Sequence, residues 1–474
     1  MRKGFFASVA ALATGAGVAY AQPGPAGPPP AAGGYPAWPG PAVRGAVPGA
    51  APGMPGDPNA FLGAPGGYPA GPGPMPIPPA QDMPLYGQVP GPDYPHPLNP
   101  GAQPKYGSQV GQVHKAAGGP DKWWIDVEEN IWTIRSMGVP IPLLTSGPAS
   151  SNGIVGAPGT TVLIGDENLE RHEWFSVFRL TGGKWNCDRT WGWELSGFIS
   201  EQRTLNFDTG LPATGNNVLA RPIIDALTGL PTSFLVTQPG SFGGTAHVDT
   251  RFHMGGAEAN VLKSLLYCDM VKANLLGGIR YIDTTEALDI TSTSTLPNPN
   301  DANNPIISTV TDQFHTHNQF LGGQVGAETE LRCGRLFLDA TGKIALGNMH
   351  ERLVVQGETI STVGTTTTAV PGGLLAVLTN SGKFSRNEFA YVPEGSVKVG
   401  WQWTQRISTY VGADFLYLSR VFRPGPQIDP VVNPTLVPVS NQFGQNFGAI
   451  RPLPILHQSD FWAGGATLGL SIRY

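Results

Sequence analysis

The sequence predicts an all-β protein: a transmembrane, antiparallel, up-and-down β-barrel of about ten strands (eight to twelve), preceded by a disordered Pro/Gly-rich segment. Three observations lead to this prediction. The chain begins with a pattern typical of exported proteins, its later part alternates apolar and polar residues over long segments, and the connections between these segments are short and long in turn. The predicted regions are a signal peptide over 1–21, a tether over 22–120 and the barrel over 121–474.

The first 21 residues have the three parts of a secretory signal peptide. Arg2 and Lys3 form a basic start, a short apolar run follows, and Ala19-Tyr20-Ala21 gives the small-x-small pattern of a cleavage site. The apolar run is too short to cross a bilayer as a helix, and no later run reaches about 18 apolar residues. The sequence therefore predicts export without a helical anchor.

Residues 22–120 are dominated by Pro, Gly and Ala, and they hold 27 of the 47 prolines. Gly and Pro recur without a strict three-residue period, which excludes collagen. The segment has too little apolar surface to offset the entropy lost on ordering, so we expect a disordered chain with polyproline II character. We interpret it as a spacer or tether, and a periplasmic or cell-wall partner for it stays open.

Long strands are predicted from residue 123 onward. In RLFLDATGKIALG, Leu336, Leu338 and Ile344 share one face, while Asp339 and Lys343 share the other. About nine to eleven tilted residues cross a bilayer as a strand, and this segment is long enough to do so. Ten strands of this kind are predicted, over residues 123–136, 170–181, 185–201, 245–262, 268–286, 313–331, 335–355, 387–404, 407–421 and 459–474.

The connections alternate in length, as they do in outer-membrane barrels. Tight turns are predicted at 181–184, 263–267, 332–334 and 404–406, and long connections at 138–169, 204–243, 287–312, 357–386 and 423–457. An even number of strands places both ends of the barrel on the short-turn, periplasmic side. Twelve strands would result if residues 361–380 formed another hairpin.

Charged side chains fall on one face of the predicted strands. A Lys or Arg on the lipid face costs about 2–4 kcal/mol at the bilayer midplane, whereas the lumen accepts charge. In VKANLLGGIRYI, Lys272 and Arg280 lie opposite the uncharged face that includes Leu275 and Ile279. Glu129 is the exception: it shares the apolar face of the first strand, and we expect it beyond the membrane. The predicted lumen-facing residues are Asp126, Glu128, Glu194, Lys272, Arg280, Glu328, Glu330, Asp339, Lys343, Lys398 and Arg473.

The last segment, ATLGLSIRY, predicts the strand that closes the barrel. Leu468, Leu470, Ile472 and Tyr474 share one face, which we expect to contact outer-membrane lipid. An unpaired strand edge in a membrane is costly, so this strand is expected to pair with the first one. A terminal aromatic residue on the lipid face fits the aromatic girdle of such barrels. We also expect the barrel-assembly machinery to recognise this strand.

Sequence motifs of catalysis are missing. No GxSxG, HExxH, Walker loop or dinucleotide fingerprint occurs in the context that each requires, so we predict no enzymatic activity and no cofactor. The net charge of −5 disfavours nucleic acid as a partner. His315 and His317 share a strand face in FHTHNQF, and we expect them at the mouth of the lumen or in its loop rather than in a metal site.

Three cysteines are spread along the chain, without a CxxC pair. Cys187, Cys268 and Cys333 all lie within a few residues of predicted short turns, hence at the periplasmic rim. Three cysteines allow one disulfide at most, and the sequence does not choose the pair.

The chain contains, in this order, PLLTSG (142–147), GAPGTTVLIGD (156–166), LLGGIRYIDTTEALDI (275–290), NQFLGGQVGAETELRCGRLFLDATGKIALGNMHE (318–351), FAYVPEGSVKVGWQWT (389–404) and DFLYLSRVFRPGPQID (414–429). This order resembles the beta-barrel porin-7 family of planctomycete outer-membrane proteins, over about residues 123–474. WQW at 401–403 departs from the GY-type pair expected there. Membership would imply an outer-membrane β-barrel, and the resembling motifs carry no catalytic residues.

The expected function is porin-like passage of small solutes or ions through a narrow lumen, beneath long extracellular loops. Barrels of about eight strands are filled by side chains, and open aqueous channels are typical of about 16–18 strands, so ten strands leave little room. A non-conducting surface, structural or adhesion barrel is the alternative. A secreted soluble β-sandwich comes next, and an enzyme within the lumen is a further alternative.

Overall fold

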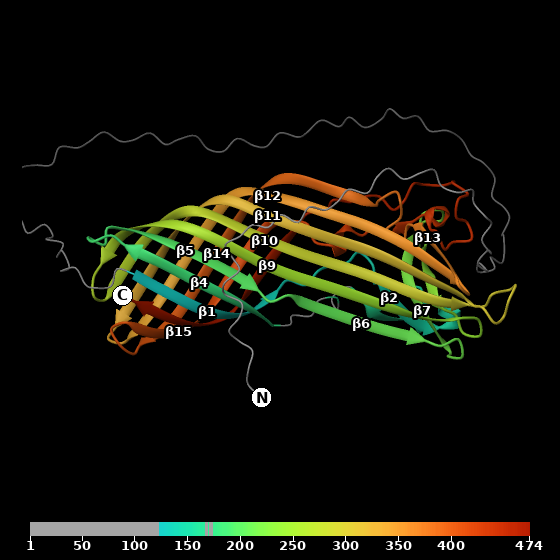
Figure 1. Cartoon of the computed structure of the whole chain (residues 1–474), viewed down its shortest axis with the longest axis horizontal. Helices are drawn as coiled ribbons and strands as arrows, with labels where there is room; N and C mark the ends of the chain where they lie inside the picture. The colour runs from blue at the N-terminus through green and yellow to red at the C-terminus, as the bar shows by residue number, and fades with distance from the viewer. Residues whose placement is uncertain (1–122, 166–168, 170–173) are drawn as a thin grey trace, which may run out of the picture. The chain divides into compact units, whose positions relative to one another are not determined.

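The computed structural model describes residues 123–165, 169 and 174–474, and the predicted signal peptide and tether lie outside these residues. Ten strands form a closed antiparallel ring in which β17 returns to β1, so the predicted barrel is confirmed (Figure 1). In ring order they are β1 (Trp123–Ile134), β4 (Phe175–Trp185), β5 (Trp191–Ser200), β9 (Gly243–Tyr267), β10 (Val271–Leu296), β11 (Ile306–Cys333), β12 (Leu336–Val363), β14 (Gly382–Gln402), β15 (Ile407–Val421) and β17 (Ser459–Arg473).

Two predicted turns are wrong, because the strands run through them. β4 continues to Trp185, and β9 continues to Tyr267. The glycines that suggested a turn in TGGK serve packing within β4 instead: a Cβ on Gly183 would lie 2.1 Å from the ring of Trp124. Glycine is therefore needed at this position for close approach between neighbouring strands.

The ring closes between β1 and β17, as the sequence predicts. Val127 lies opposite Leu470 and Ile125 opposite Ile472 in the antiparallel register. The N–H of Trp123 donates to the carbonyl of Tyr474 at 2.8 Å, and the N–H of Tyr474 donates back to Trp123 at 2.8 Å. Both ends of the barrel therefore lie at the end with the short connections, which we call the turn end; the opposite end is the loop end.

The wall of the barrel is much taller on one side. β9, β10, β11 and β12 contain 25, 26, 28 and 28 residues, whereas β1, β4 and β5 contain 12, 11 and 10. A strand of 28 residues is roughly 90 Å long. We call β9–β12 the tall wall; beyond the ring it is widened by β6 (Arg203–Leu211), which pairs with β9, and by β13 (Thr366–Pro371), which pairs with β12. The hairpin within 361–380 thus adds no strand to the ring.

A second, five-stranded sheet covers the inner face of the tall wall at the loop end (Figure 1). It contains β2 (Leu144–Pro148), β3 (Thr161–Ile164), β7 (Asn217–Asp225), β8 (Pro231–Thr237) and β16 (Val431–Val432), with short 3₁₀ turns at Ala149–Ser151, Gly425–Gln427 and Pro434–Leu436. We call this sheet, together with residues 373–377 and 422–439, the plug. Leu144, Leu219 and Val236 of the plug pack with Val310 and Phe314 of the tall wall in one buried core.

Segments that the sequence predicts as long loops thus build the plug and the extension of the tall wall. Among the described residues, no helix is long and apolar enough to cross a membrane.

An apolar belt surrounds the barrel between the turn end and the polar part of the tall wall. Ile279, Val325 and Phe389 face outward in it and are each 62% exposed. Such a continuous exposed apolar surface marks contact with lipid. On β17 the belt runs from Tyr474 to Trp462, which gives an aromatic residue at each edge.

Glu129 lies inside this belt, so the prediction that it lies beyond the membrane is wrong. It points outward between Phe178 and Leu468, which are both exposed apolar neighbours in the register. The hydroxyl of Ser176 donates to its carboxylate. This hydrogen bond, toward the loop-end edge of the belt, gives the carboxylate a polar partner in otherwise apolar surroundings.

A charge placed in the middle of the belt is expected to destabilise the barrel. Val411 is 59% exposed and lies on β15 halfway between the outward-facing Ile407 and Phe415. Val411→Arg is expected to lower the free energy of unfolding in lipid by about 2–4 kcal/mol. Thr309→Arg, on the extension of the tall wall, is the matched control and should change it by less than about 0.5 kcal/mol. Equal effects in equilibrium urea unfolding would contradict the placement of the belt.

Candidate functional site: the barrel lumen

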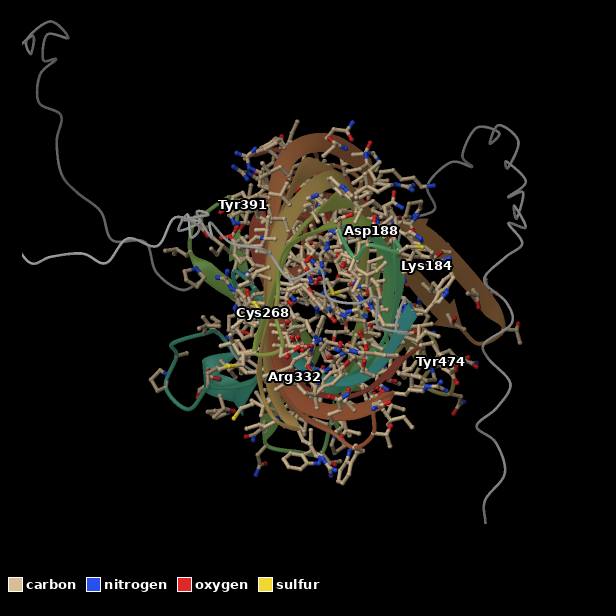
Figure 2. All side chains as sticks on the ribbon, turned by 90° about the vertical axis from the view of Figure 1, so that its left-hand side faces the viewer. Lys184, Asp188, Cys268, Arg332, Tyr391 and Tyr474 are labelled. Carbon is tan, nitrogen blue, oxygen red and sulfur yellow. The ribbon has the colours of Figure 1, made fainter. Side chains whose placement is uncertain are left out.

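A polar cavity occupies the turn-end half of the lumen. The cavity has a volume of about 200 Å³, and its wall extends from Trp124 and Arg189 near the turn end to Glu394 deeper inside. Lys184, Asp188, Cys268, Arg332 and Tyr474 lie around the ring at this end (Figure 2). Ten of the eleven residues predicted to face the lumen line the cavity: Asp126, Glu128, Glu194, Lys272, Glu328, Glu330, Asp339, Lys343, Lys398 and Arg473. The eleventh, Arg280, also points inward, and its side chain is 3% exposed.

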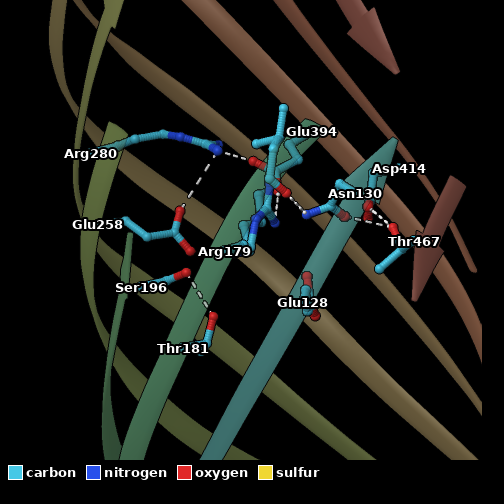
Figure 3. Close-up of polar contacts among 12 residues, drawn as sticks. Glu128, Asn130, Arg179, Thr181, Ser196, Glu258, Arg280, Glu394, Asp414 and Thr467 are labelled. Atoms are coloured by element: carbon cyan, nitrogen blue, oxygen red, sulfur yellow. Dashed lines mark hydrogen bonds and ion pairs between the residues drawn. The ribbon is translucent and has the colours of Figure 1, made fainter. Parts of the chain in front are cut away.

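Arg280 belongs to a buried network of ion pairs deeper in the barrel (Figure 3). Its guanidinium contacts Glu394 and lies 3.8 Å from Glu258. Arg179 donates to the other side of Glu394 at 2.8 Å, and Lys343 donates to Glu258. Five strands on different sides of the ring supply these groups, so the network connects the walls across the lumen.

A second network lies closer to the turn end, around Glu330. Lys272 contacts this carboxylate at 2.7 Å, Arg332 at 2.8 Å and Arg473 at 3.1 Å. Because Arg473 lies on β17 and Glu330 lies on β11, this contact ties the two strands together across the lumen. The carboxylate of Glu330 is buried, and these close contacts neutralise it, since an unpaired buried charge is costly.

Glu128 forms a third contact group with Lys398 and Tyr410. Lys398 donates to its carboxylate, and the hydroxyl of Tyr410 donates at 2.8 Å. The sequence prediction missed Tyr410, Arg179, Glu258 and Glu394 in the lumen. Glu394 shares strand parity with Lys398, which was predicted to face the lumen. No lumen-facing residue was predicted on the strands of the other three, but Arg179 alternates with the exposed Phe178 and Leu180, and that parity could have found it.

Four carboxylates in the cavity wall form no ion pair within the described part of the chain: Asp126, Glu194, Glu328 and Asp339. Glu194 accepts a hydrogen bond from the amide of Asn260 at 3.3 Å. These groups give the cavity polar walls of mixed charge, in which ions or small polar molecules from the turn end could reside. They do not form a metal site: among the described residues, no three His, Cys, Asp or Glu side chains are placed to hold a metal ion.

Beyond the cavity, the lumen is filled by a layer of apolar side chains, which we call the apolar layer. Trp132 and Phe320 in this layer are 0% exposed, and Phe461 is 1% exposed. Phe252 stacks on Phe461, with 5.6 Å between ring centroids, and contacts Phe175 edge-on at 5.6 Å. The layer contains Trp132, Ile134, Phe175, Val177, Phe252, Met254, Ile282, Phe320, Ala345, Met349, Ala390, Val392, Leu416, Leu418, Val421, Phe461 and Ala463, with Phe198 of β5 packed against it.

Nine strands of the ring contribute buried side chains to the apolar layer, and β5 contributes Phe198, which packs against it. Its members are at most 2% exposed, so water does not reach them in this conformation. The polar cavity is therefore separated from the loop end.

Buried ion pairs fasten the plug to the tall wall on the other side of the apolar layer. Arg221 of β7 contacts Asp312 of β11 at 2.5 Å, and the two side chains are 1% and 0% exposed. Asp312 also accepts from the N–H groups of Leu375 and Ala376 at 2.8 and 2.7 Å. These contacts make the plug part of the folded core, because leaving either charge without its partner would be costly.

The two histidines expected at the mouth of the lumen face outward instead, so that prediction is wrong. His315 and His317 have the strand parity of Leu321, which is exposed in the apolar belt. The Nε2 atom of His315 lies 2.7 Å from Asp289, and that of His317 lies 2.6 Å from Asp283.

The three cysteines lie at the turn end, as expected. All three are exposed: Cys187 follows β4, Cys268 follows β9, and Cys333 ends β11. The structure describes no disulfide between Cys268 and Cys333.

Comparison with known proteins places the barrel in a family. A family model described as "Putative beta barrel porin-7" matches residues 124–474, and no curated protein matches the chain. Among solved structures, the outer membrane protease OmpT of Escherichia coli is 9% identical with a TM-score of 0.37, over 75% of this chain and 97% of that one. The toluene transporter TodX of P. putida is 7% identical with a TM-score of 0.18, over 75% and 91%. A FadL homologue of Pseudomonas aeruginosa is 7% identical with a TM-score of 0.18, over 75% and 90%.

The family model covers nearly all of the described residues, and its family description agrees with the ring of ten strands and the apolar belt. The protein belongs to the putative beta barrel porin-7 family and is an outer-membrane β-barrel.

Proposed function

We propose that this protein is a closed outer-membrane barrel, exported by its N-terminal signal peptide, that acts as a structural or adhesion protein at the cell surface. One observation carries the proposal: the apolar layer fills the lumen with buried side chains from nine strands, and Phe198 of the tenth packs against it. Water and ions cannot pass through tightly packed apolar side chains without displacing them. The proposal includes neither catalytic activity nor a cofactor.

The plug adds a second barrier in series with the apolar layer. Its core includes Leu288, Val310 and Val355 of the tall wall, which are 0 to 1% exposed. Opening a path would have to separate Arg221 from Asp312 and expose this core, so spontaneous opening is disfavoured. The tall wall and the plug instead form a rigid surface outside the membrane. This surface faces the exterior of the cell, because long loops and extensions of such barrels lie on the extracellular side.

Porin-like passage of small solutes or ions is the second candidate function. The polar cavity favours this function. It opens at the turn end, and its walls carry both positive and negative side chains, so a solute could enter it from the periplasm. This function requires a second conformation in which the apolar layer and the plug both move.

Planar-bilayer recording of the full-length protein separates the two candidates. We expect no stepwise current from wild-type protein, because the apolar layer blocks the lumen. Insertion is checked in the same preparation by heat-modifiable gel mobility and by protection of the barrel from protease. Stepwise currents from protein that passes both checks would refute the closed barrel and favour the porin-like candidate.

A further inference from the structure

Two adjacent rows of outward-facing side chains on the tall wall are rich in cationic groups. The strand register defines them: one row is His253, Thr285, His317, Arg352 and Ser385, and the next is Arg251, Ala287, His315, Val354 and Lys383. We call these ten residues the cationic strip. It crosses β9, β10, β11, β12 and β14, holds three Arg or Lys and three His, and contains no carboxylate.

The cationic strip lies just outside the apolar belt. Tyr281, Leu321 and Phe389 are the last exposed apolar residues of the belt on β10, β11 and β14. One row of polar residues follows, in which Gln319 donates to the hydroxyl of Tyr281 at 2.9 Å. Thr285 is four residues beyond Tyr281, roughly 13 Å along the strand. With the usual tilt of such strands, the strip therefore begins at the level of the lipid head groups.

Some of the basic side chains of the strip are paired with carboxylates, and others can contact a ligand. Arg251 and His315 share Asp289, which lies in the row farther from the membrane, and His317 contacts Asp283 in the row nearer to it. Arg352 and Lys383, in contrast, are exposed and form no ion pair with any described residue. Two exposed cations near three imidazoles form a surface suited to phosphate groups.

The opposite wall lacks such a surface. At the corresponding ends of its strands, Glu201 and Asp460 are exposed, and Arg420 of β15 contacts Glu388, which belongs to β14, at 3.1 Å. Positive and negative groups are thus mixed there. The two rows of the cationic strip contain no carboxylate themselves, and the flanking rows supply Asp283 and Asp289.

We propose that the cationic strip binds the phosphate groups of lipid head groups in the outer leaflet, and that Arg352 and Lys383 supply most of the attraction. Basic residues near a membrane surface attract anionic lipid by about 1 kcal/mol each. The strip would therefore hold phosphorylated lipid against the tall wall and fix the rotation and height of the barrel in the membrane. This inference does not depend on whether the lumen conducts.

The test uses full-length protein in detergent, titrated with diphosphorylated lipid A and with the same lipid after removal of both phosphates, and bound lipid is counted by native mass spectrometry. We expect wild-type protein to prefer the phosphorylated lipid and the R352Q/K383Q variant to bind it about 30-fold more weakly. The matched control R335Q/R406Q removes two cations from turns at the other end of the barrel and should bind like wild type. The variant R352K/K383R keeps both charges and should also bind like wild type.

Three results would overturn the proposal. One is equal binding of the two lipids by wild-type protein, and another is unchanged binding by R352Q/K383Q when heat-modifiable mobility shows that the variant is folded. The third is complete displacement of the lipid by inorganic phosphate at an equal concentration, which would make the strip a simple anion site and not a lipid site.

Discussion

Deletion of Ile472–Tyr474 is expected to abolish assembly of the barrel. Ile472 pairs with Ile125 on one side and with Ile407 on the other, and Tyr474 exchanges two backbone hydrogen bonds with Trp123. The deletion leaves the edges of two strands unpaired within the membrane, where each unsatisfied backbone group costs several kcal/mol. It also removes Arg473, one of the three cations around Glu330.

The yield of heat-modifiable protein in the outer-membrane fraction measures this effect. We expect a loss of at least tenfold, whereas removal of residues 30–32 from the Pro/Gly-rich segment should leave the yield unchanged. Tyr474→Ala keeps the other strand pairs, so an intermediate yield from this variant would indicate that the assembly machinery reads the terminal aromatic itself. Equal yields from the two deletions would contradict the role of β17 in closing the barrel.

Asp312→Ala is expected to release the plug from the tall wall. The carboxylate of Asp312 is completely buried and binds Arg221 together with two backbone N–H groups. Its removal leaves Arg221 buried without a counter-charge, which costs about 3–5 kcal/mol. We expect this loss in the free energy of plug opening, measured by hydrogen exchange of residues 219–224 and 374–377, with little change in the transmembrane strands.

A double variant tests whether the ion pair itself causes this effect. Arg221→Met combined with Asp312→Leu removes both charges and fills their space with apolar atoms, so much of the lost stability should return. If Asp312→Ala alone changes the free energy of opening by less than about 1 kcal/mol, the plug is not fastened through this pair.

The strands of the barrel could be predicted from the sequence because the membrane imposes a simple rule on them. Every second residue faces lipid, so a charged residue such as Lys272 or Glu328 identifies the other face of its strand. The same rule places His315 and His317 on the lipid-side face, in line with Leu321 and Val325. The expectation that they lie at the mouth of the lumen or in its loop came from their polarity, and strand parity predicts their position better.

The apolar layer could not be predicted in the same way. Phe320 shares its parity with Gln324 and Glu328, so one face of β11 changes from polar to apolar along its length. Alternation reports the face of a residue but not its level in the barrel, and the level depends on how far neighbouring strands are shifted. The error for Glu129 has the same cause: its face was correct, and its level was not.

The plug could not be predicted from the sequence either. β2 and β3 contain five and four residues, too few for a clear alternating pattern, and the barrel strands β4 and β5 and the strand β6 separate them from β7 in the sequence. Arg221 and Asp312 lie 91 residues apart, and nothing local in either segment indicates that they pair. Pairings between distant short strands depend on the complete fold.

The central claim is a closed β-barrel in the outer membrane, and membrane fractionation followed by heat-modifiable gel electrophoresis tests it most directly. The account predicts that the protein is recovered in the outer-membrane fraction and that unheated samples migrate differently from boiled ones. Recovery in the soluble fraction, with the same mobility before and after boiling, would contradict it.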